Sequence, residues 1–272
     1  MESGVRTVRL RTGVTVQCFV RGRVGKMNDE GGAPLLLLHA WGESWRSFTR
    51  LIAALPSATI VAPDLRGHGG ADKPGSGYSL VEVSEDVTAL SEHLCVRRAH
   101  VLGSSSGGYV AQQLAVLHPE LVQSLMLVGA PLSLEGKPPF GDELEQLRDP
   151  VTEAWVRRSL SWYQLLHTVP PDYIEDRVQD GMSIPADVWR ASLRGLCEAA
   201  PPTQEGRISV PTLIIRGAHD HLVPRSHQEA LAQRIPGAVL RTYEDTGHLV
   251  LWECPERVAE DVRDFVGLSI RK

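Results

Sequence analysis

The fold is decided by the stretch Val101-Leu102-Gly103-Ser104-Ser105-Ser106-Gly107-Gly108, in which an apolar run passes directly into a turn of glycine and serine. A helical pattern continues over residues 108–117. A serine on so sharp a strand-to-helix turn has a strained backbone, and larger side chains two positions away would collide with their neighbours. Only Ser105 has glycine at both of these positions, Gly103 and Gly107. The sequence therefore predicts that the Ser105 hydroxyl is exposed above a sheet edge, where it can act as a nucleophile.

Two other interpretations of this stretch fit less well. If Ser106 were the central serine, it would be flanked by Ser104 and Gly108, so one of the two glycines would be missing. A loop rich in serine and glycine can also cradle a phosphate group, but the Gly-Lys-Ser/Thr that a P-loop needs does not follow. Ser105 is therefore the preferred nucleophile.

Short apolar runs alternate with helical patterns on either side of this stretch. An antiparallel hairpin is predicted at the start of the chain, over residues 5–10 and 14–20. Continuous apolar runs suit strands buried on both faces, and they recur at residues 35–38, 58–62, 100–102 and 125–128. Helices are expected between them at residues 45–55, 80–94 and 108–117. This alternation predicts an α/β fold with a mostly parallel sheet covered by helices on both faces.

The alternation stops after the run at residues 125–128. From residue 131 to residue 207 no strand-like run occurs, and prolines divide the stretch into helical patterns at residues 143–148, 151–166, 173–181 and 185–198. Strands then resume at residues 212–215 and 238–243, with helices at residues 226–234 and 256–266. We therefore expect a core of residues 1–130 and 208–272, with residues 131–207 inserted between core strands as a helical cap, or lid.

Composition and charge exclude several classes of protein. The 272 residues are 42% apolar and 22% charged, as in one globular domain with an insertion. A net charge of −5 with scattered basic residues argues against nucleic-acid binding. No apolar run approaches the ~20 residues of a membrane span, and the first residues do not resemble a secretory signal, so we expect a cytoplasmic location without membrane contact. The four cysteines form no C-x-x-C pair, so neither a metal site nor a disulfide framework is expected.

Together these features resemble the α/β-hydrolase superfamily over nearly the whole chain. The resemblance implies an eight-stranded sheet and a catalytic triad in the order serine, acid, histidine. Asp220 follows the strand expected at residues 212–215, where the family's acid lies, and His248 lies between the next strand and the last helix. The triad is therefore expected to be Ser105, Asp220 and His248. The imidazole would take the serine proton, and Asp220 would hold it in one tautomer and stabilise its protonated form.

Other titratable residues near these positions are expected to have structural roles. His219, His221 and Asp245 adjoin members of the triad, and no metal is assigned to the histidines. The stretch Asp64-Leu65-Arg66-Gly67-His68-Gly69-Gly70 resembles a family loop whose Asp, Arg and His orient the backbone near the site. Direct catalysis by His68 is not expected.

The resemblance also implies an oxyanion hole of two backbone N–H groups. Ser106, the residue after the nucleophile, supplies one of them. Trp41 is expected to supply the other, because His39-Ala40-Trp41-Gly42 follows a strand and resembles the family's His-Gly-x loop. Ala40 replaces the glycine of that loop, which raises the question of its backbone conformation. Trp41 and Tyr109 are also expected to contact the substrate, because both lie close in sequence to the site.

Aromatic side chains gather in the cap. They are Phe140, Trp155, Trp162, Tyr163, Tyr173 and Trp189. Aromatic residues at helical spacing often pack only against one another. We nevertheless expect an apolar pocket beneath the cap for the acyl or alcohol group of a substrate.

A serine nucleophile suits acyl transfer to water, because an alkoxide attacks acyl carbon. Epoxide hydrolases and haloalkane dehalogenases of this superfamily carry aspartate at the same position. We therefore expect hydrolysis of a carboxylic ester or lactone of a small, largely apolar molecule through an acyl-enzyme, with no metal or cofactor. A carbon–carbon bond hydrolase or a cofactor-free perhydrolase on the same triad is the alternative. A small-molecule binding protein without catalysis fits less well, since every triad residue is present.

Overall fold

The computed structural model describes residues 3–25, 32–136 and 140–267, which form one sheet of eight strands. The strands are β1 (Ser3–Arg9), β2 (Thr15–Arg21), β3 (Leu35–Leu38), β4 (Ile60–Pro63), β5 (Ala99–Ser104), β6 (Val122–Val128), β7 (Thr212–Gly217) and β8 (Val239–Tyr243). Their order across the sheet is β1-β2-β4-β3-β5-β6-β7-β8. Only the pairs β1–β2 and β2–β4 are antiparallel. The predicted mostly parallel sheet and its opening hairpin are confirmed.

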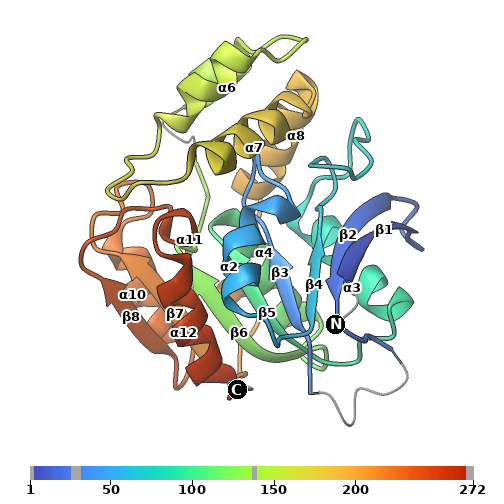
Figure 1. Ribbon diagram of the computed structural model, residues 1–272, viewed down its shortest axis with the longest axis vertical. Helices are drawn as coiled ribbons and strands as arrows, with labels where there is room; N and C mark the ends of the chain where they lie inside the picture. The colour runs from blue at the N-terminus through green and yellow to red at the C-terminus, as the bar shows by residue number, and fades with distance from the viewer. Residues whose placement is uncertain (1–2, 26–31, 137–139, 268–272) are drawn as a thin grey trace.

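Helices cover both faces of the sheet (Figure 1). The core helices are η1 (Trp45–Phe48), α2 (Thr49–Ala54), α3 (Leu80–His93), α4 (Ser106–Leu117), α10 (Arg225–Arg234), α11 (Val250–Glu253) and α12 (Pro255–Val266). Helices α2 and α12 pack together on one face, and α3 and α4 pack together on the other. None of the helices in the described ranges is long and apolar enough to cross a membrane.

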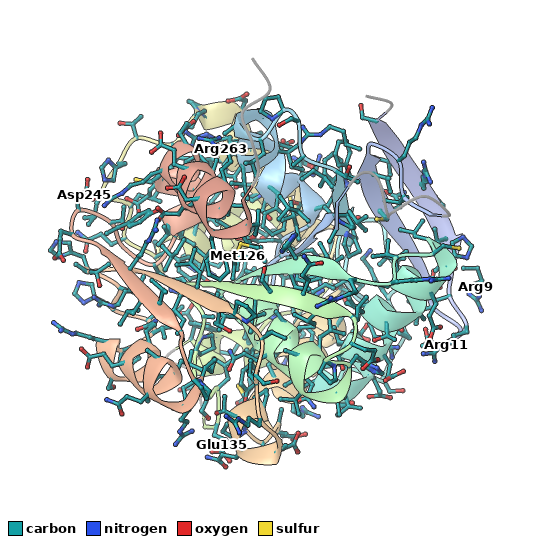
Figure 2. The ribbon with its side chains drawn as sticks, turned by 90° about the horizontal axis from the view of Figure 1, so that it is seen from below. Arg9, Arg11, Met126, Glu135, Asp245 and Arg263 are labelled. Atoms are coloured by element: carbon teal, nitrogen blue, oxygen red, sulfur yellow. The ribbon has the colours of Figure 1, made fainter. Side chains whose placement is uncertain are left out.

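The four consecutive leucines of β3 explain why the central strands are apolar throughout. Leu35 and Leu37 pack with α2 and α12, whereas Leu36 and Leu38 pack with α3 and α4. All four are at most 2% exposed. Full burial of a leucine side chain stabilises a fold by about 1.5–3 kcal/mol, so both faces of the strand must be apolar. Figure 2 shows Met126 of β6 at the middle of the molecule and Arg9, at the end of β1, at its edge.

Between β6 and β7 the described residues form helices joined by loops, and no strand. The helices are α5 (Gly141–Glu145), α6 (Glu153–Leu160), α7 (Pro171–Met182), α8 (Ala186–Cys197) and α9 (Pro202–Glu205). Figure 1 shows α6, α7 and α8 beyond the ends of the central strands. We use the term cap for residues 131–207.

The helix predicted over residues 151–166 is wrong beyond Leu160, where α6 ends. The backbone N–H groups of Leu166 and His167 both donate to Oε2 of Glu253, at 2.8 Å each. A helix would need these donors for carbonyl groups four residues earlier. The chain after α6 therefore leaves the helical path and runs to α11.

Helix α4 begins directly against the end of β3. A Cβ atom on Gly107 would lie 2.2 Å from the carbonyl oxygen of Leu38 and 2.4 Å from that of His39. A Cβ atom on Gly103 would lie 2.4 Å from the carbonyl oxygen of Gly107. These neighbours are main-chain atoms, which cannot move aside as a side chain can. Both glycines of the motif are therefore required for the close contact between β3, β5 and α4.

The substitution Gly107→Ala is expected to lower the free energy of unfolding by about 2 kcal/mol or more, because β3 and α4 must move apart. Chemical denaturation of the purified variant measures this change. Gly75→Ala is the matched control, since a Cβ at Gly75 meets nothing within 4 Å. Equal stability of the two variants would contradict the prediction.

Candidate active site

Ser105 lies at the sharp turn between β5 and α4. Its φ of 48° and ψ of −119° lie in a region that L-residues rarely adopt. Its N–H donates to the carbonyl oxygen of Val128 at 2.8 Å, and its own carbonyl accepts from Gly108 at 2.9 Å. The turn exposes the hydroxyl above the carboxyl ends of the parallel strands, next to the N-terminus of α4. Such a position favours developing negative charge.

Three strand ends bring Ser105, Asp220 and His248 together. Ser105 follows β5, Asp220 follows β7 and His248 follows β8. Nε2 of His248 lies 2.9 Å from Oγ of Ser105, and Nδ1 lies 2.8 Å from Oδ2 of Asp220. Both distances are those of hydrogen bonds. The arrangement allows the imidazole to take the hydroxyl proton while the carboxylate holds the opposite ring nitrogen.

Asp220 is held rigidly on the side away from the imidazole. Its Oδ1 accepts hydrogen bonds from the N–H groups of Leu222 and Val223, at 2.9 Å each. The carboxylate is fully buried, so these donors replace the water that it would otherwise bind. The other oxygen, Oδ2, accepts from Nδ1 of His248. This hydrogen bond fixes the tautomer of His248 that carries its proton on Nδ1.

The loop after β3 lies beside Ser105. Nδ1 of His39 donates to the carbonyl oxygen of Ala40 at 2.8 Å, and Nε2 accepts from the N–H of Leu65 at 2.9 Å. Burial lowers the pKa of His39 well below its usual value, so the ring is neutral. Ala40 has no positive φ, so alanine is accommodated there without strain. The N–H of Trp41 donates to Oγ of Ser106 at 2.7 Å.

The stretch at residues 64–70 holds this loop through Asp64. Its two carboxylate oxygens accept from the N–H of Trp45 at 2.8 Å and from the N–H of Gly70 at 2.7 Å. Burial raises the pKa of Asp64 to about 6, although both hydrogen bonds oppose the rise. Arg66 forms a buried two-pronged ion pair with Asp86, at 2.6 and 2.8 Å. Asp64 thus binds backbone N–H groups and Arg66 binds helix α3, and neither side chain is hydrogen-bonded to Ser105 or His248 in the described residues.

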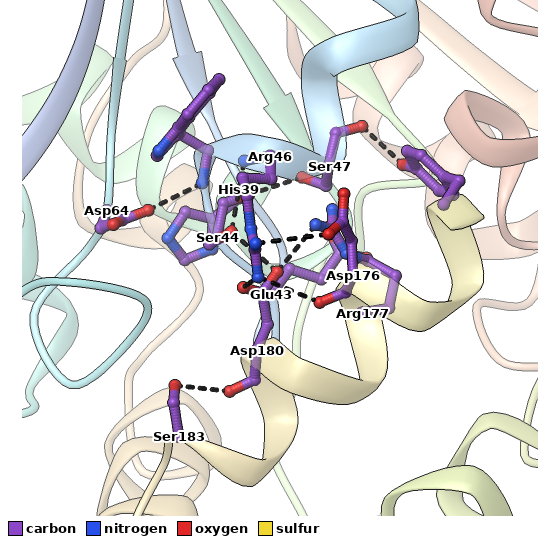
Figure 3. A network of polar contacts seen from close by, with 12 residues as sticks. His39, Glu43, Ser44, Arg46, Ser47, Asp64, Asp176, Arg177, Asp180 and Ser183 are labelled. Atoms are coloured by element: carbon purple, nitrogen blue, oxygen red, sulfur yellow. Dashed lines mark hydrogen bonds and ion pairs between the residues drawn. The ribbon is translucent and has the colours of Figure 1, made fainter. Parts of the chain in front are cut away.

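A network of ion pairs joins the loop after β3 to helix α7 of the cap (Figure 3). Asp180 on α7 accepts from Oγ of Ser44 at 2.7 Å and from Arg46 at 2.6 Å. A terminal nitrogen of Arg177 lies 2.8 Å from the same carboxylate. The pKa of Glu43, in this network, is raised by burial and partly lowered by Arg177. These contacts fix the position of the cap relative to the loop that carries Trp41.

A second connection joins the cap to His248. The ring of Tyr163 stacks on that of His248, with centroids 5.7 Å apart and planes 14° apart. Glu253 binds the two cap N–H groups through Oε2, and its Oε1 accepts from the N–H of Gly247 at 3.3 Å. One buried carboxylate therefore holds both the cap and the loop that carries the imidazole.

A cavity of about 220 Å³ opens over Ser105 and His248, between the core and the cap. Its described aromatic lining residues are Trp41, Phe140, Trp162, Tyr163, Trp189 and Trp252. Trp41, which the sequence predicts to contact the substrate, lines this cavity. Tyr109 does not reach the described lining: it is fully buried in the core, and its hydroxyl donates to the carbonyl oxygen of Ala199 at 3.2 Å.

The titratable neighbours of the triad face elsewhere. His219 and His221 are exposed on either side of Asp220. Asp245 is also exposed and lies 3.3 Å from Arg257. In the described part of the chain no hydrogen bond joins these three side chains to Ser105 or His248. Sequence reasoning missed Glu253 and Asp180, and it expected Tyr163 only as one of several aromatic residues near a pocket. Glu253 contacts Leu166 and His167, Tyr163 contacts His248, and Asp180 contacts Ser44, all of them partners distant in the chain.

Glu253→Gln is expected to lower kcat about 10-fold, because an amide cannot accept all three N–H groups and the His248 loop would shift. Steady-state kinetics on a model ester measures this effect, with KM expected to change less than kcat. Glu256→Gln is the control, since this carboxylate is 68% exposed and lies 3.7 Å from Arg50. An unchanged kcat in Glu253→Gln would show that the bridge does not position the imidazole.

The pKa of His68 is lowered from 6.5 to about 4 by burial. Between these values the unfolded chain binds more protons than the folded chain, so stability is expected to fall as pH decreases from 6.5 to 4. The loss attributable to His68 approaches about 3 kcal/mol. Urea denaturation at several pH values should show a shallower fall for His68→Gln. An identical pH dependence in both proteins would contradict this assignment.

Comparison with known proteins agrees with this geometry. The family described as alpha/beta hydrolase fold matches residues 33–255. Pyrrolizixenacetamide deacetylase from Xenorhabdus hominickii is 31% identical over 252 residues, which cover 88% of this chain and 92% of that protein. The esterase RhEst1 from Rhodococcus sp. ECU1013 is 26% identical, with a TM-score of 0.78 over 97% of this chain and 98% of that one. The enol-lactonase from Burkholderia xenovorans LB400 has the same fold at 23% identity, with a TM-score of 0.79 over 96% of this chain and 100% of that one. The chain therefore belongs to the α/β-hydrolase fold family.

Proposed function

We propose that this protein hydrolyses a carboxylic ester or lactone of a small, largely apolar molecule through an acyl-enzyme on Ser105. The observation that carries the proposal is the continuous hydrogen-bonded chain from Ser105 through His248 to Asp220 at the floor of the cavity. The aromatic lining suits an apolar acyl or alcohol group. The relatives support the same chemistry, since a deacetylase, an esterase and an enol-lactonase are among them.

In the proposed reaction, Oγ of Ser105 attacks the substrate carbonyl carbon while Nε2 of His248 takes its proton. Negative charge then develops on the carbonyl oxygen, next to the N–H of Ser106 and the loop of Trp41. The imidazolium gives the proton to the leaving alcohol oxygen, and the acyl group stays on Ser105. Water attacks the acyl-enzyme carbonyl while His248 takes its proton; the acyl–Oγ bond then breaks, the imidazolium returns the proton to Oγ of Ser105, and the carboxylic acid leaves. No metal or cofactor takes part in these steps.

The natural substrate class can be tested by comparing the rates of the candidate reactions directly. The test measures kcat/KM for four reactions. They are hydrolysis of esters of increasing chain length, hydrolysis of lactones, carbon–carbon cleavage of a vinylogous diketone, and peracid formation. Ester or lactone turnover at the highest kcat/KM supports the proposal, and preferential carbon–carbon cleavage or perhydrolysis replaces it. Binding without turnover would indicate a small-molecule binding protein.

A fluorophosphonate probe is expected to label the wild-type protein at Ser105, and Ser105→Ala is expected to lose both labelling and ester turnover. Asp220→Asn should lower kcat by about 10⁴-fold while the fold is retained, because the imidazole loses its anionic partner. Mass mapping of the adduct and ester kinetics are the measurements.

Asp245→Asn is the matched control for the acid, since this exposed carboxylate follows the same strand as His248. Its kcat should stay within about 2-fold of wild type. Labelling that persists in Ser105→Ala would move the nucleophile elsewhere. A larger loss in Asp245→Asn than in Asp220→Asn would reassign the acid.

A further inference from the structure

The side chain of Ser106 lies between Ser105, the expected nucleophile, and the backbone N–H of Trp41, an expected oxyanion donor. It follows the nucleophile directly, lies in the first turn of α4 and lines the cavity. Its Oγ accepts a hydrogen bond from the N–H of Trp41 at 2.7 Å. The donor expected to face the substrate from the loop after β3 is therefore already bound to a hydroxyl.

The hydrogen of that hydroxyl is available. Among the residues that the structure describes, none accepts a hydrogen bond from Oγ of Ser106, although the residue is only 9% exposed. A buried hydroxyl without an acceptor is costly, so an acceptor supplied by the substrate would satisfy it. A hydroxyl that accepts a hydrogen bond also becomes a stronger donor, because the two bonds polarise each other.

We propose that Ser106 gives two hydrogen bonds to the substrate carbonyl oxygen, one from its backbone N–H and one from its hydroxyl, and that Trp41 acts through this hydroxyl. The inference rests on the proposed function. The backbone N–H of Ser106 belongs to the first turn of α4, where no preceding helical carbonyl accepts it. The hydroxyl keeps its proton throughout, so it stabilises the charge on the oxygen without proton transfer.

Packing around Ser106 holds this arrangement in place before the substrate arrives. Gly107 allows the first turn of α4 to lie against the end of β3. A Cβ atom at this position would lie 2.2 Å from the carbonyl oxygen of Leu38. Trp41 is fixed at its other end, because its Nε1 donates to Oγ of Ser192 on α8 at 3.0 Å. Donors that are preorganised in this way cost no reorganisation during the reaction.

A competing role makes the opposite prediction. If the hydroxyl only blocks the N–H of Trp41, the substrate oxygen must displace it to reach that donor. Removing the hydroxyl would then free the N–H of Trp41 and leave kcat unchanged or raise it. The proposed role predicts that removing the hydroxyl lowers kcat, because the oxyanion loses a direct donor.

The test compares Ser106→Ala with Ser106→Thr, which keeps the hydroxyl. Ser106→Ala is expected to lower kcat about 10- to 100-fold with KM within about 2-fold, whereas Ser106→Thr should retain most of the activity. Affinity for a trifluoromethyl ketone, which forms an oxyanion with Ser105, should fall by the same factor as kcat in Ser106→Ala. Ser91→Ala is the control for loss of a buried helical hydroxyl, since Oγ of Ser91 donates to Val87 in α3 at 2.9 Å.

An unchanged or higher kcat, or undiminished affinity for the ketone, in Ser106→Ala would overturn the inference. Equal losses in Ser106→Ala and Ser91→Ala, accompanied by equal falls in melting temperature, would also overturn it. Failure of the proposed function has a different signature, because wild-type protein would then neither hydrolyse the ester panel nor be labelled at Ser105. The ketone measurement reports on the oxyanion site even if the natural substrate is not an ester.

Discussion

The backbone at Ser105 is held in a conformation that costs about 1–3 kcal/mol, and the surrounding structure must offset this cost. The hydrogen bond from its N–H to Val128 fixes one side of the turn, and the contact of α4 with β3 fixes the other. That contact requires glycine at positions 103 and 107. Because the turn is rigid, the hydroxyl stays above the ends of β5, β7 and β8, where Asp220 and His248 meet it. The strain is thus tied to the position of the reacting oxygen.

The sheet was predictable because each central strand carries its apolar pattern locally. Leu35 to Leu38 must be apolar at every position, since alternate side chains enter two different helix layers. The helix expected over residues 151–166 was wrong beyond Leu160 for the opposite reason. The N–H groups of Leu166, its last residue, and of His167 bind Glu253, which lies 87 and 86 positions away in the chain. Local periodicity contains no information about such a partner.

The positions of Ser105, Asp220 and His248 were also predictable, because a parallel sheet places the residues after its strands at one edge. The surroundings of the triad were not. Tyr109 lies close to Ser105 in sequence, but helix α4 turns its side chain into the core. Tyr163 belongs to no motif, and its ring nevertheless stacks on that of His248. Nearness along the chain predicts a loop or a turn well, whereas the direction of a side chain depends on tertiary packing.

Glu253 binds main-chain groups of the cap, and this has a consequence for how the family can diversify. Backbone N–H groups are the same in every residue except proline, so the bridge places almost no demand on which side chains the cap carries. The cap residues around the cavity can therefore change with the substrate while the histidine loop keeps its support. A cap taken from a relative would need a segment that reaches α11 and presents two successive backbone N–H groups to Glu253, as Leu166 and His167 do here. The bridge therefore depends on the course of the cap backbone and not on the side chains that line the cavity.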